Sequence, residues 1–365
     1  MKTGLSLTQL AAELERQTAS RRDYIAPQGK LQAVPVEADI QIDGINGQPF
    51  AITPYAHGQL SQHLAIPKAY YDRMKAEKPE LLAANVNTWL HADSDNKRMV
   101  RALDGKVRAF LSPKYRPLDN FDLASTILPV LMSRKVEIMS ADLTETRMYI
   151  KAVLPELSDE LPAGLAYGGH NRIGTDRGHL VSAIVISNSD IGAGTLRVEP
   201  SVFTTHCTNL AIMFEAAMKK YHIGRAGQAD TESYEVFSDV TRQADDRAFW
   251  LKVKDVTMAA FREDLFRKAI DSIKAAGDRP IKSDDLAAVV DSVVEVLALP
   301  PASNSGILKH LAAGGDLTQW GLSSAITRVA NDADDYEYAT VLERAGGRVL
   351  ALPAADWSKL ATAAA

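Results

Sequence analysis

Apolar residues near the start of the chain recur at the spacing of an amphipathic helix. In residues 5–16, LSLTQLAAELER, the apolar side chains fall on one stripe, which predicts a helix there. The same spacing returns over residues 57–90, interrupted at Pro67 and Pro79, so we expect three more helices, the first two forming a helical hairpin. Between these stretches the segment DIQIDGI alternates between apolar and polar residues, which favours strands.

Apolar and polar residues continue to alternate through the middle of the chain. MVRAL and VRAFL flank Asp104-Gly105, a pair favoured in type I′ turns, so this stretch predicts a β-hairpin. SRKVEIMSADLTETRMYIKAVLP predicts a second hairpin, and LVSAIVIS and TLRVEP predict two further strands. We expect one helix from Asn120 through FDLASTILPVLM. We expect another in TTHCTNLAIMFEAAMKKYHI, capped by Thr204, Thr205 or Thr208.

The pattern becomes helical after Gly227. Residues 230–277 predict one long helix or a broken pair, and SDDLAAVVDSVVEVLAL predicts another helix with Ser283 as its N-cap. Residues 306–365 predict further helices, with GGRVLALP as a short β-like stretch. The acidic pairs Asp284-Asp285 and Asp334-Asp335 fall at predicted helix starts, where the helix dipole favours them.

These elements predict an α+β fold with a hairpin-rich central antiparallel sheet, surrounding helices and a mainly helical C-terminal region. We divide the chain into an N-terminal region with a helical hairpin (1–96), a central basic α+β domain (97–226) and a mainly helical C-terminal domain (227–365).

Composition places the chain among ordinary globular proteins, with 365 residues, 46% hydrophobic and 24% charged. The single cysteine, Cys207, excludes an internal disulfide framework and a cysteine-rich zinc site, and it suits a reducing cytoplasm. The sequence holds no secretory signal and no apolar run long enough to cross a bilayer. We therefore expect a cytoplasmic protein without a membrane partner, a metal or a cofactor.

Positive charge is concentrated although the net charge is −5. Residues 97–225 hold 17 Lys and Arg against 13 Asp and Glu, and residues 97–116 hold seven cations against Asp104 alone. If Arg101 and Arg108 share a face of the hairpin, their like charges are unfavourable unless an external anion compensates them. This predicts a surface for a polyanion, most simply nucleic acid, with Tyr115 stacking on bases.

Glycine-rich residues 168–179, GGHNRIGTDRGH, form a second candidate anion contact, although they match neither a P-loop nor a dinucleotide-binding fingerprint. The predicted nucleic-acid-binding residues are Lys97, Arg98, Arg101, Lys106, Arg108, Lys114, Tyr115, Arg116, Arg172, Arg177 and Arg197. The simpler interpretation is a solvated edge hairpin that its cations protect against aggregation.

Two other motifs could each indicate a different function. Residues 57–75 have the spacing of a helix-turn-helix, which would place Lys68, Tyr71, Arg73 and Lys75 at a DNA groove, but plain helical hairpins are commoner. His206 and Cys207 are adjacent without the context of a cysteine nucleophile, so a buried structural cysteine is the favoured interpretation.

Three stretches of the chain resemble a known family. RALDGKVRAFLSPKYRPLDN, VISNSDIGAGTLRVEPSVFTTHCTN and LTQWGLSSAITRVANDADDYEYATVLERAGGRVLAL resemble the phage/plasmid-like family known as domain of unknown function 932. The resemblance covers residues 55–353 and carries no catalytic residues. It implies a setting in phages, plasmids and integrated elements, and hence roles around DNA.

Charge and resemblance together predict a non-catalytic, homo-oligomeric nucleic-acid-binding protein that binds or anneals single-stranded DNA in replication or recombination. The first alternative is an interaction or assembly protein of a mobile element, with the hairpin as a protein-binding edge. The second is an enzyme on nucleotides or phosphoesters that uses His170, Asp176, His179 and His206. The sequence leaves open DNA or RNA, single or double strands, and the role of residues 1–54.

Overall fold

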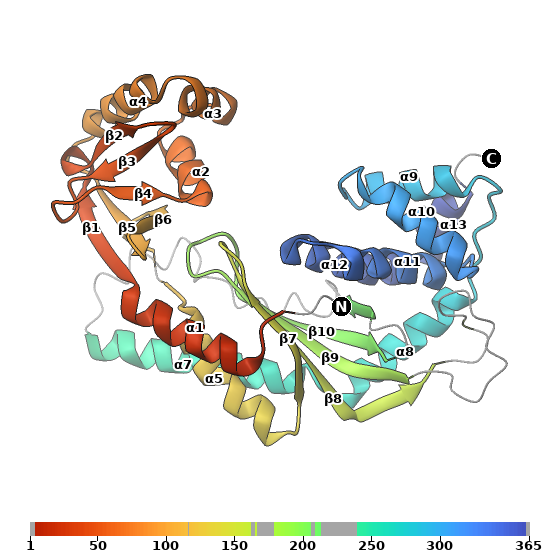
Figure 1. Cartoon of the computed structure of the whole chain (residues 1–365). Helices are drawn as coiled ribbons and strands as arrows, with labels where there is room; N and C mark the ends of the chain where they lie inside the picture. Colours follow the sequence, from red (N-terminus) through yellow and green to blue (C-terminus); the bar gives the residue numbers. More distant parts are fainter. Residues whose placement is uncertain are drawn as a thin grey trace.

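The computed structural model describes residues 4–115, 117–161, 165, 179–205, 209–212 and 239–362. It contains a six-stranded sheet and a five-stranded sheet, with helices packed around both (Figure 1). The α+β fold expected from the sequence is confirmed, as are the antiparallel hairpins and the helical C-terminal region.

The six-stranded sheet has the strand order β1-β5-β6-β4-β3-β2, antiparallel except for the β4–β6 pair. Its strands and the short 3₁₀ helix are β1 (Arg22–Pro27), η1 (Gln28–Lys30), β2 (Gln32–Val36), β3 (Asp39–Asp43), β4 (Phe50–Ile52), β5 (Lys97–Leu103) and β6 (Lys106–Leu111). Three helices share its apolar core, namely α2 (Pro54–His63), α3 (Lys68–Glu77) and α4 (Pro79–Ala92).

The predicted hairpin is present as β5 and β6, and both turn residues, Asp104 and Gly105, have the positive φ of a type I′ turn. It forms the inner strands of the N-terminal sheet, whereas the sequence grouped it with the strands that follow it. Both strands of the hairpin are paired on each side within the sheet. The hairpin is therefore neither a solvated edge nor an edge that a protein partner could extend. A β-bulge lies in it, because Arg101 pairs with Ala109 and Ala102 with Val107, which leaves Arg108 as the extra residue.

The five-stranded sheet is antiparallel throughout, in the order β11-β10-β9-β8-β7. Its strands are β7 (Glu137–Leu143), β8 (Met148–Glu160), β9 (His179–Asn188), β10 (Arg197–Thr204) and β11 (Asn209–Ile212). The helix predicted over TTHCTNLAIMFEAAMKKYHI is wrong at residues 209–212, which form β11. There the edge of β10 supplies backbone partners, and Leu210 is buried, so tertiary packing outweighs the helical pattern.

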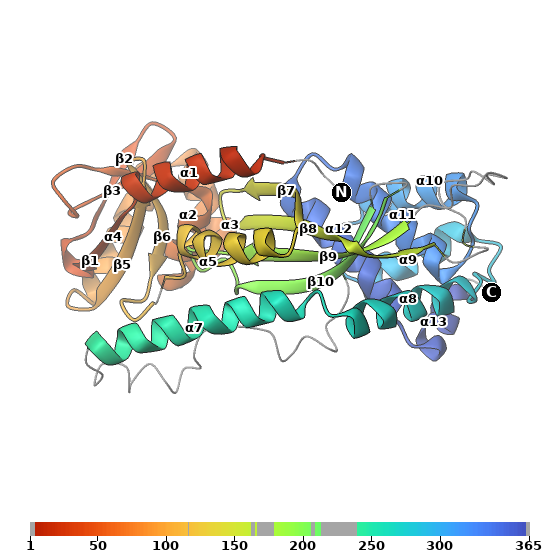
Figure 2. The same cartoon turned by 90° about the horizontal axis from the view of Figure 1, so that it is seen from below.

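Each face of this sheet is covered by different helices (Figure 1 and Figure 2). Side chains of one face pack against α1 (Leu7–Ser20), α5 (Asn120–Ser133), α7 (Asp239–Ala259) and α8 (Glu263–Gly277). On the other face, Lys151 and Glu199 reach α12 (Tyr336–Ala351). The predicted broken helical pair is confirmed within residues 239–277, as α7 and α8.

The C-terminal helices enclose a core of their own. They are α9 (Leu286–Val296), α10 (Ser303–Gly314), α11 (Gln319–Asp332), α12 and α13 (Ala354–Ala361). The β-like interpretation of GGRVLALP is wrong, because residues 346–351 are the end of α12. Asp285 and Asp335 accept hydrogen bonds as N-caps of α9 and α12, which explains the acidic pairs and replaces the predicted Ser283 cap.

Candidate functional site

A group of buried and partly exposed charges, here named the arginine–aspartate cluster, lies where the two sheets meet. It comprises Arg21, Asp23, Arg101, Arg108, Asp119 and Asp190. Arg101 is at its centre, with a side chain only 1% exposed. Its Nε and Nη2 donate to both carboxylate oxygens of Asp23 at 2.8 and 3.0 Å, and Nη2 also donates to Asp119 Oδ1 at 2.6 Å. Its Nη1 donates to the backbone carbonyl of Asp190.

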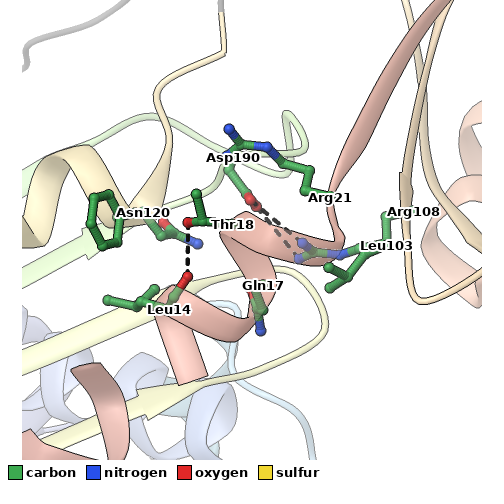
Figure 3. Close-up of a pocket in the computed structure, with 9 residues that line it drawn as sticks. Leu14, Gln17, Thr18, Arg21, Leu103, Arg108, Asn120 and Asp190 are labelled. Carbon is green, nitrogen blue, oxygen red and sulfur yellow. Dashed lines mark hydrogen bonds and ion pairs between the residues drawn. The ribbon is translucent and has the colours of Figure 1, made fainter. Parts of the chain in front are cut away.

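Arg108 joins the cluster because the β-bulge turns it out of register with Arg101. Its Nη1 and Nη2 each lie 3.4 Å from a carboxylate oxygen of Asp190, and Nη2 also donates to the carbonyl of Glu145 at 3.1 Å. Figure 3 shows Arg108 facing Asp190, with Arg21 beside them. Arg21 itself pairs with Asp119 at 2.7 Å.

The cluster therefore balances three guanidinium groups with three carboxylates. Burial alone lowers the pKa of Arg101, but its hydrogen bond to Asp23 and the charges of Asp119 and Asp23 outweigh that effect and raise it. The prediction that Arg101 and Arg108 await an external polyanion is wrong, since the folded chain already matches both. Their partners are distant in the sequence, so the local charge count could not reveal them.

Further hydrogen bonds near the cluster also link the two sheets. Gln59 of α2 donates to the carbonyl of Ile191 at 3.2 Å and accepts from the backbone N–H of Phe110 at 2.8 Å. Asp104, the single acidic residue in the sequence of the hairpin, accepts a hydrogen bond from Arg16 of α1 at 2.8 Å. The turn of the hairpin is thus bonded to α1, and Gln59 links β6 to the turn that follows β9.

A small pocket opens beside the cluster, lined by Arg21, Arg108, Asn120 and Asp190 among others (Figure 3). Its empty space is about 240 Å³, including the part open to solvent. The space enclosed between its side chains is about that of a single water molecule, so the pocket is too small for a nucleotide.

The other predicted cations do not converge. Lys97, Lys106 and Lys114 are exposed, but Lys97 starts β5 and Lys106 follows the turn, at opposite ends of the hairpin. Arg98 is half-buried, and burial lowers its pKa. Among the described residues, the side chains of Lys97, Arg98 and Lys106 form no ion pair.

Tyr115 is half-buried against the apolar cluster around Leu111 and Ile191, which cover part of the side chain that was predicted to stack on bases. Arg197 is partly exposed and lies 3.8 Å from Glu199. Arg116, Arg172 and Arg177 lie outside the described residues, as do His170, Asp176, His206 and Cys207. Of the proposed enzyme residues only His179 is described, exposed at the start of β9.

The helical hairpin predicted over residues 57–75 is present as α2 and α3. Tyr71 is buried and its hydroxyl is 2.8 Å from Nδ1 of His57, so it cannot read a DNA groove. The cations of this hairpin are matched by acids. The pairs are Lys68 with Asp72, Arg73 with Glu77 and Lys75 with Asp39.

Sequence reasoning missed an uncharged surface on α4. The α4 stripe, as we name it, consists of Leu81, Ala84, Asn85, Thr88, Trp89 and Ala92. These residues fall on one side of the helix, and Leu81 and Trp89 are 46% and 53% exposed. The signal was present in the sequence, because these positions continue the helical spacing without a single charge.

It also missed a fully buried ion pair, Lys151 of β8 with Glu343 of α12, 2.7 Å apart. The Lys151 ammonium lies 4.3 Å from the centroid of the Tyr336 ring. Burial lowers the pKa of Lys151, and Glu343 partly opposes this. A lysine within a strand pattern carries no sign of such a partner 192 residues away.

Comparison with known proteins adds no relative: no family model, curated protein or solved structure matches the chain. The resemblance to the phage/plasmid-like family therefore stays a prediction. Within the described part of the chain, no helix has the length and apolar character to span a bilayer. In the same residues, no three metal-ligating side chains are grouped to hold an ion.

Proposed function

We propose that this chain is a non-enzymatic interaction protein that assembles with further copies of itself through the outer face of α4. The observation that carries the proposal is the α4 stripe, which presents Trp89 and Leu81 to solvent with no charged residue between them. Helices on the surface of a globular protein ordinarily direct charged and polar residues to solvent. Exposed apolar surface of this kind is typical of protein contact sites.

The residue types suit a contact surface. Tryptophan and tyrosine dominate the binding energy of protein interfaces, because each buries a large apolar area with few rotatable bonds. Tyr70, on the adjacent helix α3, is 47% exposed. Both helices lie at the end of the molecule farthest from the five-stranded sheet (Figure 1), where a second molecule can approach without meeting the C-terminal helices.

The lack of charge on the α4 stripe suits a second copy as the partner. The chain carries a net charge of −5, so two copies repel each other overall and need a contact that adds no further like charge. In a two-fold symmetric contact the same patch lies on both sides, and any charge near the axis would face its own like. An uncharged stripe avoids this cost.

Sedimentation velocity over a concentration series tests the proposal. We expect the parent protein to sediment as a species larger than the monomer, and Trp89→Lys to sediment as a monomer. The matched control is Val296→Lys, which places the same charge at a position of α9 that is 54% exposed, and it should assemble like the parent. A parent protein that stays monomeric throughout overturns the proposal.

Nucleic-acid binding is the second candidate, favoured by the exposure of Lys97, Lys106 and Lys114. Charge reversal at Arg101 or Arg108 cannot test it, because those side chains hold the fold together. The test is fluorescence anisotropy with single- and double-stranded oligonucleotides over a salt series.

Under this candidate, Lys97→Glu with Lys106→Glu weakens binding and makes the salt dependence less steep, since each phosphate contact contributes to the slope. Arg134→Glu, at an exposed position after α5, is the control and should bind like the parent. Binding that is absent, or unaffected by the lysine pair, excludes a hairpin surface for nucleic acid.

A further inference from the structure

We infer that two copies pair α4 against α4 in antiparallel orientation, with the two-fold axis passing through Asn85 and Leu81 of each copy against Trp89 of the other. The inference rests on the proposed self-assembly and adds its orientation and register.

The spacing of the stripe is symmetric about Asn85. Leu81, Asn85 and Trp89 are separated by four residues each, so they lie on neighbouring turns of one helix side. At about 1.5 Å per residue, Leu81 and Trp89 are each about 6 Å along the axis from Asn85. A two-fold axis through Asn85 therefore superposes the Leu81 turn of one copy on the Trp89 turn of the other.

The chemistry at the centre fits this register. A carboxamide has both donor and acceptor atoms, so two Asn85 side chains can bond to each other across a two-fold axis. A single asparagine in an otherwise apolar helix contact is a known device for fixing register. Among the residues that the structure describes, Asn85 Nδ2 meets only a weak acceptor, the sulfur of Met74 at 3.8 Å.

The ends of α4 decide between antiparallel and parallel pairing. Lys78 is the N-cap of α4 and Asp93 its C-cap, and both are exposed. Antiparallel pairing brings the Lys78 end of each copy to the Asp93 end of the other. Parallel pairing would set Lys78 against Lys78 and Asp93 against Asp93. Antiparallel helices also oppose their macrodipoles.

Cysteine crosslinking tests the register. The chain has one cysteine, so Cys207→Ser gives a cysteine-free background. In that background, Asn85→Cys should form a disulfide-linked dimer under mild oxidation, because residue 85 meets its own copy at the axis. Thr88→Cys is the matched control on the same stripe. Its two copies are offset by about 9 Å along the helices, beyond the roughly 7 Å Cα separation that a disulfide spans.

A mixture of Leu81→Cys and Trp89→Cys proteins should crosslink with each other more than either does alone. The same samples are examined by sedimentation velocity, which separates the possible failures. Dimers that form without the Asn85→Cys crosslink, or with Thr88→Cys crosslinking equally well, overturn the register and leave self-assembly standing. Monomers in every sample overturn both.

Discussion

His57 of α2 shows how burial sets the behaviour of a single side chain. It is almost fully buried, with Nδ1 2.8 Å from the Tyr71 hydroxyl. Burial is the main cause that lowers its pKa to about 4, and the nearby carboxylate of Asp39 opposes the shift only in part. The imidazole is therefore neutral in the folded protein at neutral pH, and the unfolded chain gains a proton more readily than the native state.

Stability should therefore decrease at acidic pH. Between pH 6.5 and pH 4 the unfolded state binds a proton at His57 that the native state does not, so stability falls as the pH is lowered through this window. The loss amounts to about 3 kcal/mol at most for this group. His63, whose pKa burial also lowers to about 4, acts in the same direction.

We expect His57→Asn to flatten this dependence, because asparagine keeps a polar atom near the Tyr71 hydroxyl and does not titrate. Urea unfolding at pH 7, 5.5 and 4.5 measures it. The free energy of unfolding should fall less in the variant than in the parent between the first and last pH. Equal slopes for the two proteins would mean that His57 titrates normally in the native state.

At the scale of elements, α11 and α12 pack closely because of a glycine. A Cβ atom on Gly346 of α12 would lie 2.4 Å from Cγ2 of Thr327 on α11. The Thr327 hydroxyl donates to the carbonyl of Ser323 at 3.1 Å and accepts from Asn209 of β11 at 3.1 Å. The glycine thus sets the distance between two helices and, through Thr327, supports the short edge strand.

Gly346→Ala should destabilise the protein by about 1–3 kcal/mol, as overpacking of a rigid core does. Adding Thr327→Ser removes Cγ2, keeps the hydroxyl and should recover much of that loss. Thr327→Ser alone is the fourth protein of this double-mutant cycle. Denaturant unfolding of the four proteins measures the coupling, and additive losses would show that the two helices do not meet as described.

At the scale of the whole molecule, the arginine–aspartate cluster fixes the six-stranded sheet to the five-stranded sheet. Arg101 gathers Asp23 from β1, Asp119 from the segment before α5 and the backbone of Asp190 from the turn after β9. Arg108 adds a second link to Asp190. The hairpin thus uses its two central arginines for internal attachment, while its lysines stay in solvent.

Removing Arg101 should be costly because its buried guanidinium donates to Asp23, Asp119 and the Asp190 carbonyl, and methionine can replace none of these hydrogen bonds. We expect Arg101→Met to lower the free energy of unfolding by about 3–5 kcal/mol, since hydrogen bonds to charged groups contribute about 1.5–3 kcal/mol each. Lys106→Met, on the same hairpin at an exposed position, should change it by only about 0.5 kcal/mol. Similar losses in both variants would mean that the cluster does not hold the sheets together.

The sequence determined those features that depend on contacts within a few residues. The amphipathic helix near the start of the chain, the type I′ turn at Asp104-Gly105 and the aspartate caps of α9 and α12 follow from local spacing, backbone preference and one hydrogen bond each. Such features depend on contacts between near neighbours in the sequence, and this is why the fold class could be predicted.

Only the tertiary structure decided what the charges do. The carboxylate partners of Arg101 lie 78 and 18 residues away in the chain, and its carbonyl partner lies 89 residues away. A bulge of one residue directed Arg108 to the same place. A charge count treats every cation as if it faced solvent. A buried guanidinium, however, is stable only when it pairs with an acidic group, and the fold can supply that group from any part of the chain. The same long-range packing turned residues 209–212 into a strand and left the α4 stripe uncovered.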